Sequence, residues 1–221
     1  KSANPLRDKP YKQWKYLRVA STVLHFCICF RSIQNASFSS VQEKHTLVMP
    51  SALLLTCEPI PLVRIALIGL GDRGMKTLRR YAFIPHAEIR YVVDLDSEKT
   101  EAANAALTQS GRPAAVAFCG AEAWKTVCEK EDVDLVYVCT EWNTHTPMAV
   151  YAMEHGKHVA VEVPAATTVE ECFRLVRTAE ATQRHCFMTE NCCYDFFALQ
   201  TLEMFQKGKL GTITHCEGAY I

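Results

Sequence analysis

Three glycines at G-x-G-x-x-G spacing, Gly69, Gly71 and Gly74, form a loop suited to binding phosphate groups. An apolar, branched run typical of a buried parallel strand precedes them, and a helical pattern follows at once. The first glycine permits a tight turn, the second lets the backbone approach a pyrophosphate, and the third lets the helix pack closely on the sheet. The helix N-terminus then offers unpaired amides to the negative charge. This spacing predicts dinucleotide binding.

Asp94 closes the second apolar strand, about 20 residues after Gly74. A carboxylate there can accept hydrogen bonds from both hydroxyls of an adenosine ribose, which favours NAD over NADP. Asp96 and Ser97 lie beside it before a helical pattern, so the acid could instead serve a turn or cap that helix. A lone glycine pattern also occurs in surface loops. The place of Asp94 at the strand end favours it over Asp96, and the four signals together favour a cofactor.

From residue 63 onward, apolar strands alternate with amphipathic helices, which predicts an α/β fold with a doubly wound parallel sheet of the Rossmann type. The expected strands are Val63–Ile68, Glu88–Val93, Ala114–Phe118, Leu135–Cys139, His158–Val161 and His185–Thr189. The expected helices are Gly74–Tyr81, Lys99–Thr108, Ala121–Lys130, Thr146–His155 and Val169–Thr182, with Gly156 as a C-terminal cap and a capping box at Thr168. Right-handed crossovers place every strand's carboxyl end at one edge, where ligands bind.

The sequence predicts three parts along the chain. Residues 1–60 are expected to form an irregular N-terminal extension, non-native before Met49, where we expect translation to begin. Residues 61–190 form the predicted dinucleotide-binding domain. Residues 191–221 are expected to be the truncated start of an α+β substrate domain, with a helix over Phe196–Lys207 and a strand-like alternation from Gly211 to Ile221.

Composition narrows the class of protein. The 24 basic and 24 acidic residues balance, which argues against nucleic acid or a membrane as the partner, and 49% of the 221 residues are apolar, enough for a core. No cysteine or histidine cluster has zinc-ligand spacing, so we expect no metal. The 11 cysteines lie mostly in apolar patterns and are interpreted as buried thiols, as at Cys119, Cys128, Cys139, Cys172 and Cys186. Free thiols and a start at Met49 favour the cytoplasm, while the apolar stretch Leu17–Phe30 leaves export as the alternative.

Two further motifs resemble those of an oxidoreductase superfamily that includes glucose-fructose oxidoreductase and inositol dehydrogenase. The first, Cys139-Thr-Glu-Trp-Asn-Thr-His145, keeps the threonine and histidine of the superfamily pattern T-P-N-x-x-H. The second, Gly156-Lys-His-Val-Ala-Val-Glu-Val-Pro164, follows G-K-H-V-x-x-E-K-P, but Val163 stands where the dehydrogenases carry a lysine that binds substrate and moves its proton. The resemblance covers residues 62–221 and implies a Rossmann domain with NAD. The missing lysine argues against alcohol dehydrogenation by the usual residues.

A subfamily tolerates this change. The E-V-P-A-A run, the tryptophan at position 142 and the run Thr189-Glu-Asn-Cys-Cys-Tyr194 together resemble the NAD-dependent glycoside hydrolases of family 109, which include bacterial α-N-acetylgalactosaminidases. The resemblance implies a glycan or other small-molecule substrate and a tightly held NAD. It also implies transient oxidation at sugar C3, loss of the C2 proton, elimination of the glycosidic oxygen, water addition and return of the hydride. By the same analogy the full-length protein is expected to be a homo-oligomer.

The glycine motif and the resemblance together assign the site residues. Cofactor contacts are implied at Gly69, Gly71, Asp72, Arg73, Gly74, Asp94, Thr140, Trp142, Asn143, Thr144, His145, Glu162, Val163 and Asn191. Tyr220 is implied to bind substrate, and Tyr194 is an acid/base candidate within the chain. The main catalytic histidine is expected beyond Ile221. The chain alone is therefore expected to bind NAD weakly and not to turn over glycoside.

Simpler roles stay open for several of these residues. Asp72 can cap the first helix, and Trp142 can pack over a neighbouring loop. His145 can be a capping or core histidine, and Glu162 can support the backbone of a strained or cis turn. Tyr194 can be an ordinary amphipathic anchor.

Two other functions also stay open. One is an NAD-dependent sugar or polyol dehydrogenase in which another group replaces the lysine at position 163. The other is a non-catalytic NAD-binding regulatory protein, for which the missing lysine would be a sign of decay. Net NADH formation from sugar alcohols would identify the first, and glycoside cleavage without added NAD would exclude the second.

Overall fold

The computed structural model describes residues 57–215 and residue 217, and the chain divides between Met188 and Thr189 into two units. In chain order the first unit contains β1 (Val63–Ile68), α2 (Asp72–Tyr81), β2 (Ala87–Asp94), α3 (Ser97–Gln109), β3 (Val116–Cys119), α4 (Ala123–Cys128), β4 (Leu135–Val138), α5 (Trp142–Glu154), β5 (His158–Val161), α6 (Val169–Thr182) and β6 (Cys186–Met188). The second contains the 3-10 helix η3 (Cys192–Tyr194) and α7 (Phe196–Gln206). Met49, Leu17–Phe30 and Tyr220 lie outside the described residues.

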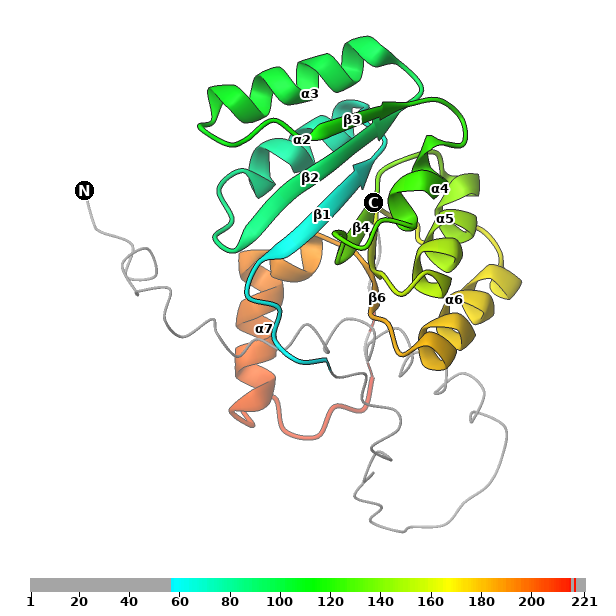
Figure 1. The fold of residues 1–221 in the computed structure, drawn as a ribbon. Coiled ribbons are helices and arrows are strands. Elements are labelled where there is room, and N and C mark those ends of the chain that lie inside the picture. Colours follow the sequence, from blue (N-terminus) through cyan, green and yellow to red (C-terminus); the bar gives the residue numbers. More distant parts are fainter. Residues whose placement is uncertain (1–56, 216, 218–221) are drawn as a thin grey trace, which may run out of the picture. The chain divides into compact units, whose positions relative to one another are not determined.

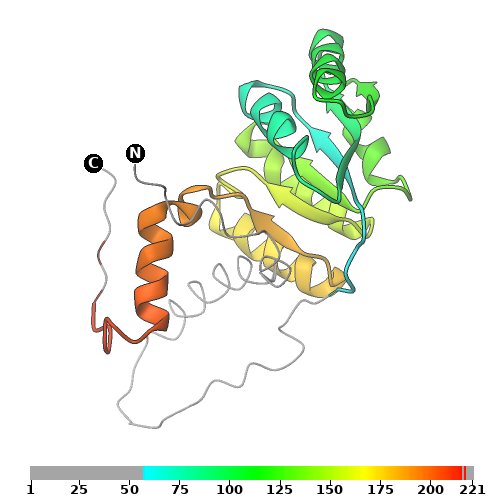
Figure 2. The same cartoon turned by 90° about the vertical axis from the view of Figure 1, so that its left-hand side faces the viewer.

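The strands of the first unit form one parallel sheet, in the order β3-β2-β1-β4-β5-β6 (Figure 1, and turned by 90° in Figure 2). The last residue of β1, Ile68, pairs in register with Val93 near the end of β2 and with Val138 at the end of β4. The carboxyl ends of the central strands therefore meet at one edge. The predicted doubly wound parallel sheet is confirmed.

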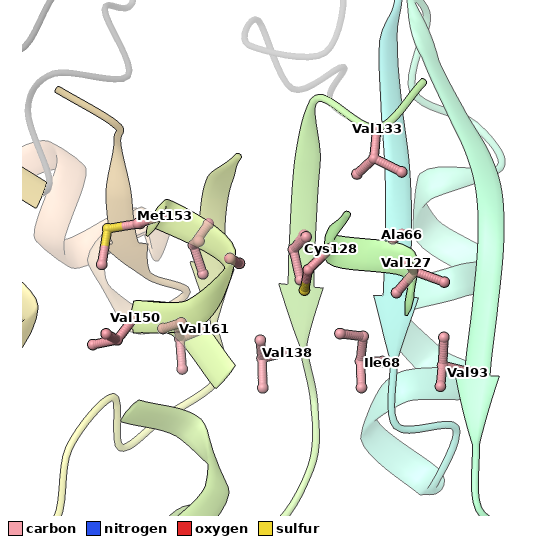
Figure 3. Close-up of a cluster of buried hydrophobic side chains, with 14 of the residues drawn as sticks. Ala66, Ile68, Val93, Val127, Cys128, Val133, Val138, Val150, Met153 and Val161 are labelled. Atoms are coloured by element: carbon pink, nitrogen blue, oxygen red, sulfur yellow. The ribbon is translucent and has the colours of Figure 1, made fainter. Parts of the chain in front are cut away.

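Side chains along the central strands alternate between two buried layers. Ala66 and Ile68 of β1 belong to a cluster with residues of α4, α5 and α6, part of which Figure 3 shows. Ile65 and Leu67 belong to a second cluster with residues of α2 and α3. Burial on both faces explains why this strand is an almost continuous apolar run. Each fully buried branched side chain contributes about 1.5–3 kcal/mol through its removal from water.

Local signals set the start of two helices. The Thr168 hydroxyl accepts a hydrogen bond from the Glu171 backbone N–H at 3.2 Å, and the Glu171 carboxylate accepts one from the Thr168 N–H at 3.1 Å. This is the predicted capping box of α6, and donors from Thr167 and Thr168 lower the pKa of Glu171. Asp96 caps α3 by accepting a hydrogen bond from the Glu98 N–H at 2.9 Å. Gly156, just past α5, has a φ of +77°, as a C-terminal cap requires.

Three helices begin earlier than predicted, and one of them is α3, which begins at Ser97 rather than Lys99. The predicted start of α5 at Thr146 is wrong, since the helix begins at Trp142 and encloses Pro147. The predicted start of α2 at Gly74 is wrong as well, since that helix begins at Asp72. Both first turns lack the apolar stripe from which a helix is recognised, because they border the edge of the sheet rather than the core.

Other differences concern strands and cysteines. The strand predicted over Ala114–Phe118 lies at Val116–Cys119, because β3 is an edge strand whose extent follows its pairing with the end of β2. Residues 211–215 form no strand, since an alternating pattern becomes one only where a partner strand pairs with it. Of the five cysteines predicted to be buried, only Cys128 is fully buried. Cys119 is exposed, and partial burial is found at Cys139, Cys172 and Cys186. The remaining predicted bounds differ by one or two residues or agree.

Two histidines pack together at the opposite edge of the sheet, where β5 and β6 begin. His158 Nδ1 accepts a hydrogen bond from the His185 backbone N–H at 3.0 Å, and the two ring centroids lie 5.0 Å apart. An imidazole nitrogen accepts only when it carries no proton. Burial, followed by the charges of His185 and Arg184 and opposed by Asp134, lowers the pKa of His158 to about 4, and burial also lowers the pKa of His185. Both rings are therefore neutral in the folded unit near pH 7.

Mild acid should weaken the fold through this histidine pair. An unfolded chain protonates its histidines below about pH 6.5, whereas folded His158 resists protonation until about pH 4. The contribution of the pair is thus complete above pH 6.5 and is lost as the pH falls from 6.5 towards 4. Urea-unfolding midpoints across this range should fall less steeply for His158→Gln than for the unmodified protein. His155→Gln, which alters an exposed ring at the end of α5, is the control, and equal slopes in all three proteins would contradict the prediction.

Candidate functional site

The glycine loop lies at the carboxyl edge of the sheet, between β1 and α2. The next strand in the chain, β2, pairs on one side of β1, while β4 pairs on the other. The strand order reverses at this point, which is where open α/β sheets bind their ligands. The β4–α5 loop and the residues that follow β5 lie at the same edge.

Each of the three glycines has a different structural environment. Gly69 has a φ of +88°, and a Cβ on it would lie 2.6 Å from the Cys139 carbonyl oxygen. A Cβ on Gly74 would lie 1.9 Å from the Gly69 carbonyl oxygen, so the helix rests directly on the loop backbone. Gly71 has an ordinary φ of −64°, and nothing lies within 4 Å of where its Cβ would be. The fold thus requires the first and third glycines, while the second leaves open space above the loop for a ligand.

Asp94 and Asp96 serve different purposes. The Asp94 carboxylate accepts a hydrogen bond from the Leu70 backbone N–H in the glycine loop at 2.7 Å, and from the Asp96 N–H at 3.2 Å. Lys99 Nζ lies 3.5 Å from Asp94 Oδ1, the oxygen that accepts from the Asp96 N–H. Asp96 instead caps α3. The acid at the strand end is therefore held beside the loop, as the sequence predicts for a ribose-binding carboxylate, and the neighbouring acid is the helix cap.

The β4–α5 loop is ordered by hydroxyl groups and a buried ring. The hydroxyls of Thr140 and Thr144 lie 2.7 Å apart, and Thr144 also donates to the Glu141 carbonyl. The His145 ring is 1% exposed, with Nδ1 2.7 Å from the Pro164 carbonyl oxygen and Nε2 3.0 Å from that of Thr140. This geometry favours the core role for His145. Its contact with the cofactor stays a prediction.

Several of the predicted contact residues are open to solvent, among them Asp72, Trp142, Asn143 and Val163. Trp142 is 65% exposed and Asn143 is also exposed, both in the first turn of α5. Val163 is 41% exposed at the carboxyl edge, next to Pro164, and the bond between them is cis. Asp72 is exposed and pairs with Lys76 at 2.7 Å, one turn along α2, and makes no capping hydrogen bond. The proposed capping role of Asp72 is therefore wrong.

Glu162 faces inward. Its carboxylate lies 2.9 Å from Arg73 Nε and accepts a hydrogen bond from the Tyr137 hydroxyl at 2.7 Å. The hydrogen bond with Glu162 raises the pKa of Arg73. Tyr81, packed edge-on against Tyr137, and Cys139 are partly buried here, and this desolvation raises the pKa of Tyr81 to about 12 and that of Cys139 well above its usual range. Arg73, Tyr81 and Cys139 therefore stay protonated at neutral pH.

Sequence reasoning singled out Arg73 and Glu162 separately but missed their pairing. It also missed Tyr81, Tyr137 and Lys99. The only available signal was a pair of tyrosines in otherwise apolar or amphipathic segments, which indicates a hydroxyl with a buried partner. Asn191 and Tyr194 belong to the second unit, which is described by itself, so their roles at this edge stay predictions.

Within 57–215 and 217, no group of three or more histidine, cysteine or acidic side chains is arranged to hold a metal ion. No helix in that same part of the chain has the length and hydropathy needed to span a membrane.

The parallel sheet and the glycine loop at its switch point define a Rossmann-type dinucleotide-binding domain. A family model described as an oxidoreductase family with an NAD-binding Rossmann fold, GFO_IDH_MocA, matches residues 63–190. This stretch is more than half of the chain and includes the loop, Asp94 and Glu162. The chain belongs to this family and contains its NAD-binding domain.

Curated relatives are similar to this chain over most of its length. The chain is 56% identical over 163 residues to the alpha-N-acetylgalactosaminidase of Bacteroides fragilis, which covers 74% of this chain and 38% of that protein. It is 48% identical over 180 residues to the glycosyl hydrolase family 109 protein of Porphyromonas gingivalis, covering 81% and 37%. The chain thus spans about two-fifths of the length of these relatives.

Solved structures share the fold. An NAD-binding protein from Listeria innocua is 28% identical with a TM-score of 0.55, covering 67% of this chain and 41% of that chain. The myo-inositol dehydrogenase of Lactobacillus casei, solved with NAD(H) and myo-inositol, has a TM-score of 0.61 and 24% identity, covering 68% and 43%. At that identity the second likeness shows the fold alone.

Substitution of the second and third glycines should separate binding from folding. Gly71→Ala places a methyl group in open space at an allowed φ, so the urea-unfolding midpoint should stay unchanged while NAD affinity falls at least about tenfold, or 1.4 kcal/mol, because the methyl blocks the pyrophosphate. Gly74→Ala forces the loop and helix apart and should cost about 1–3 kcal/mol of stability. Calorimetric titration with NAD and urea unfolding measure both effects. Unchanged NAD affinity in Gly71→Ala would place the pyrophosphate elsewhere.

Proposed function

We propose that the protein containing this chain is an NAD-dependent glycoside hydrolase that acts on α-N-acetylgalactosaminides. The observation that carries the proposal is the 56% identity to the Bacteroides fragilis alpha-N-acetylgalactosaminidase over 163 residues. Val163 supports it, because an apolar side chain stands at the carboxyl edge where the dehydrogenases of the superfamily carry a proton-transferring lysine.

The residues at the edge fit the cofactor. The space above Gly71 and the amides of the first turn of α2 suit a pyrophosphate, and Asp94 stands beside the loop for an adenosine ribose. Trp142, Asn143 and Val163 are exposed at the other half of the edge, where they suit contacts with the nicotinamide half. When bound, NAD would supply reversible oxidation at sugar C3, which acidifies the C2 proton and permits elimination and water addition without net redox change.

The residues of the first unit bind and position rather than transfer protons. Glu162 is engaged by Arg73 and Tyr137, and burial keeps the Tyr81 hydroxyl protonated. We therefore propose that the acid/base groups lie in other parts of the protein, with Tyr194 as the candidate within this chain and Tyr220 as a substrate contact.

The same proposal includes partners and location. The substrate is a glycan or other small molecule, with no nucleic acid or membrane partner, and the full-length protein is a homo-oligomer by analogy with its superfamily. Balanced charge supports the first statement. The free cysteines of the described part support a cytoplasmic location, with export as the alternative.

Cleavage of p-nitrophenyl α-N-acetylgalactosaminide tests the proposed function. The longest natural form of the protein that contains this chain should release p-nitrophenol without added NAD, and its denaturation should release NAD detectable by mass spectrometry. No net NADH should accumulate, because the hydride returns to the sugar.

Two other outcomes would assign other functions. Net NADH from sugar alcohols without glycoside cleavage would indicate a sugar or polyol dehydrogenase. Bound NAD with neither activity would indicate a regulatory protein. The p-nitrophenyl β-anomer, offered at the same concentration, is the control for linkage.

Charge at the ribose end should set the preference for NAD over NADP. Asp94→Asn keeps an acceptor for the Leu70 N–H but removes the charge that repels a 2′-phosphate, and it frees Lys99 to meet that phosphate. The ratio of NAD to NADP affinities should therefore fall at least about tenfold. Asp96→Asn, which changes only the α3 cap, is the matched control and should keep the ratio. Titration calorimetry with both nucleotides decides, and an unchanged ratio in Asp94→Asn would contradict the ribose assignment.

A further inference from the structure

An ion pair connects the two halves of the candidate dinucleotide site. Arg73 lies in the first turn of α2, immediately before the third glycine of the loop, and Glu162 follows the last residue of β5. Arg73 Nε and Glu162 Oε1 are 2.9 Å apart. In the sheet, β4 separates β1 from β5, so the pair reaches across a whole strand at the point where the strand order reverses.

The middle strand contributes to the same contact. Tyr137 on β4 donates its hydroxyl to the Glu162 oxygen that faces Arg73, at 2.7 Å. The Glu162 side chain is only 9% exposed, whereas that of Arg73 is 38% exposed. A carboxylate so deeply buried needs partners to compensate for its lost hydration. Arg73 from α2 and the Tyr137 hydroxyl from β4 therefore hold the Glu162 carboxylate, which follows β5.

Each end of the ion pair leads directly to a backbone segment at the binding edge. At the Arg73 end lies the glycine loop, with open space where a Cβ on Gly71 would be. At the Glu162 end lies Val163, followed by Pro164, whose carbonyl oxygen meets the His145 ring of α5. The first segment belongs to the adenosine half of the edge and the second to the nicotinamide half.

We propose that Arg73 and Glu162 are positioning residues whose ion pair holds the two halves of the dinucleotide site in register. A ligand that spans both halves then depends on the pair, whereas a ligand confined to the adenosine half does not. This inference rests on the proposed cofactor site. It is independent of which reaction the full-length protein catalyses.

A neighbouring ion pair gives a matched comparison. Asp72 and Lys76 are 2.7 Å apart, four residues apart on the same helix, with both side chains more than half exposed. An exposed pair within one helix contributes little and connects nothing beyond that helix. Removal of Lys76 therefore changes the charge near the loop by the same amount as removal of Arg73, without separating the two halves.

Binding of NAD and of ADP by the full-length protein freed of nucleotide tests the inference. ADP reaches the glycine loop and the ribose acid but not the β5 side. Arg73→Met should weaken NAD binding at least tenfold and change ADP binding less than twofold in titration calorimetry. Arg73→Lys should restore part of the NAD affinity, and Lys76→Met should leave both affinities unchanged.

A second variant guards against a folding defect. Glu162→Gln is isosteric, keeps an acceptor for Tyr137 and removes only the charge, so it should reproduce the selective loss of NAD affinity even if Arg73→Met fails to fold. A purely structural role would lower the unfolding temperature and weaken both nucleotides alike.

The remaining outcomes are decisive. Equal losses for NAD and ADP, or no loss for either, would overturn the positioning role. Failure of the unmodified protein to bind either nucleotide would overturn the site on which the inference rests. A selective loss of NAD affinity in a protein without glycosidase activity would support the positioning role while rejecting the proposed function.

Discussion

Direct contact between backbone segments at the end of β1 is the constraint on which the rest of the structure depends. A Cβ at position 74 would lie 1.9 Å from the Gly69 carbonyl oxygen, and a Cβ at position 69 would lie 2.6 Å from that of Cys139. Segments from β1, α2 and β4 thus meet without side chains between them. Because of this contact, the first turn of α2 lies at the point where the strand order of the sheet reverses. Open space remains beside Gly71 in the loop.

Three acids near this edge have different structural roles. Asp96 is a helix cap at the surface, Asp94 accepts a hydrogen bond from the glycine loop, and Glu162 is buried with a cation and a hydroxyl. Each carboxylate has donors in the folded chain, as buried or half-buried anions require. Such an edge is suited to holding a dinucleotide in a defined place.

A polar side chain at the other end of the sheet is also held by a hydrogen bond. At the opposite edge, His158 accepts a hydrogen bond from the His185 backbone, which requires a neutral ring. The interior between these edges consists of branched side chains in two layers. Both ends of a parallel sheet therefore carry its polar groups, and in this chain one end serves ligands while the other serves stability.

Local patterns in the sequence predict the parallel sheet, the glycine loop and the place of Asp94 at the end of β2, because apolar runs and glycine spacing involve residues close together in the chain. Continuous apolar runs mark strands buried on both faces, a capping box marks the start of α6, and Gly69 and Gly74 are needed wherever a helix rests on a strand end. The first turns of α2 and α5 escaped prediction because they lack an apolar stripe. Only the tertiary structure decided that Arg73 pairs with Glu162, that His145 faces inward and that Cys119 is exposed. These properties depend on segments that the sheet order brings together, and strand order is set by long-range packing that no local pattern encodes.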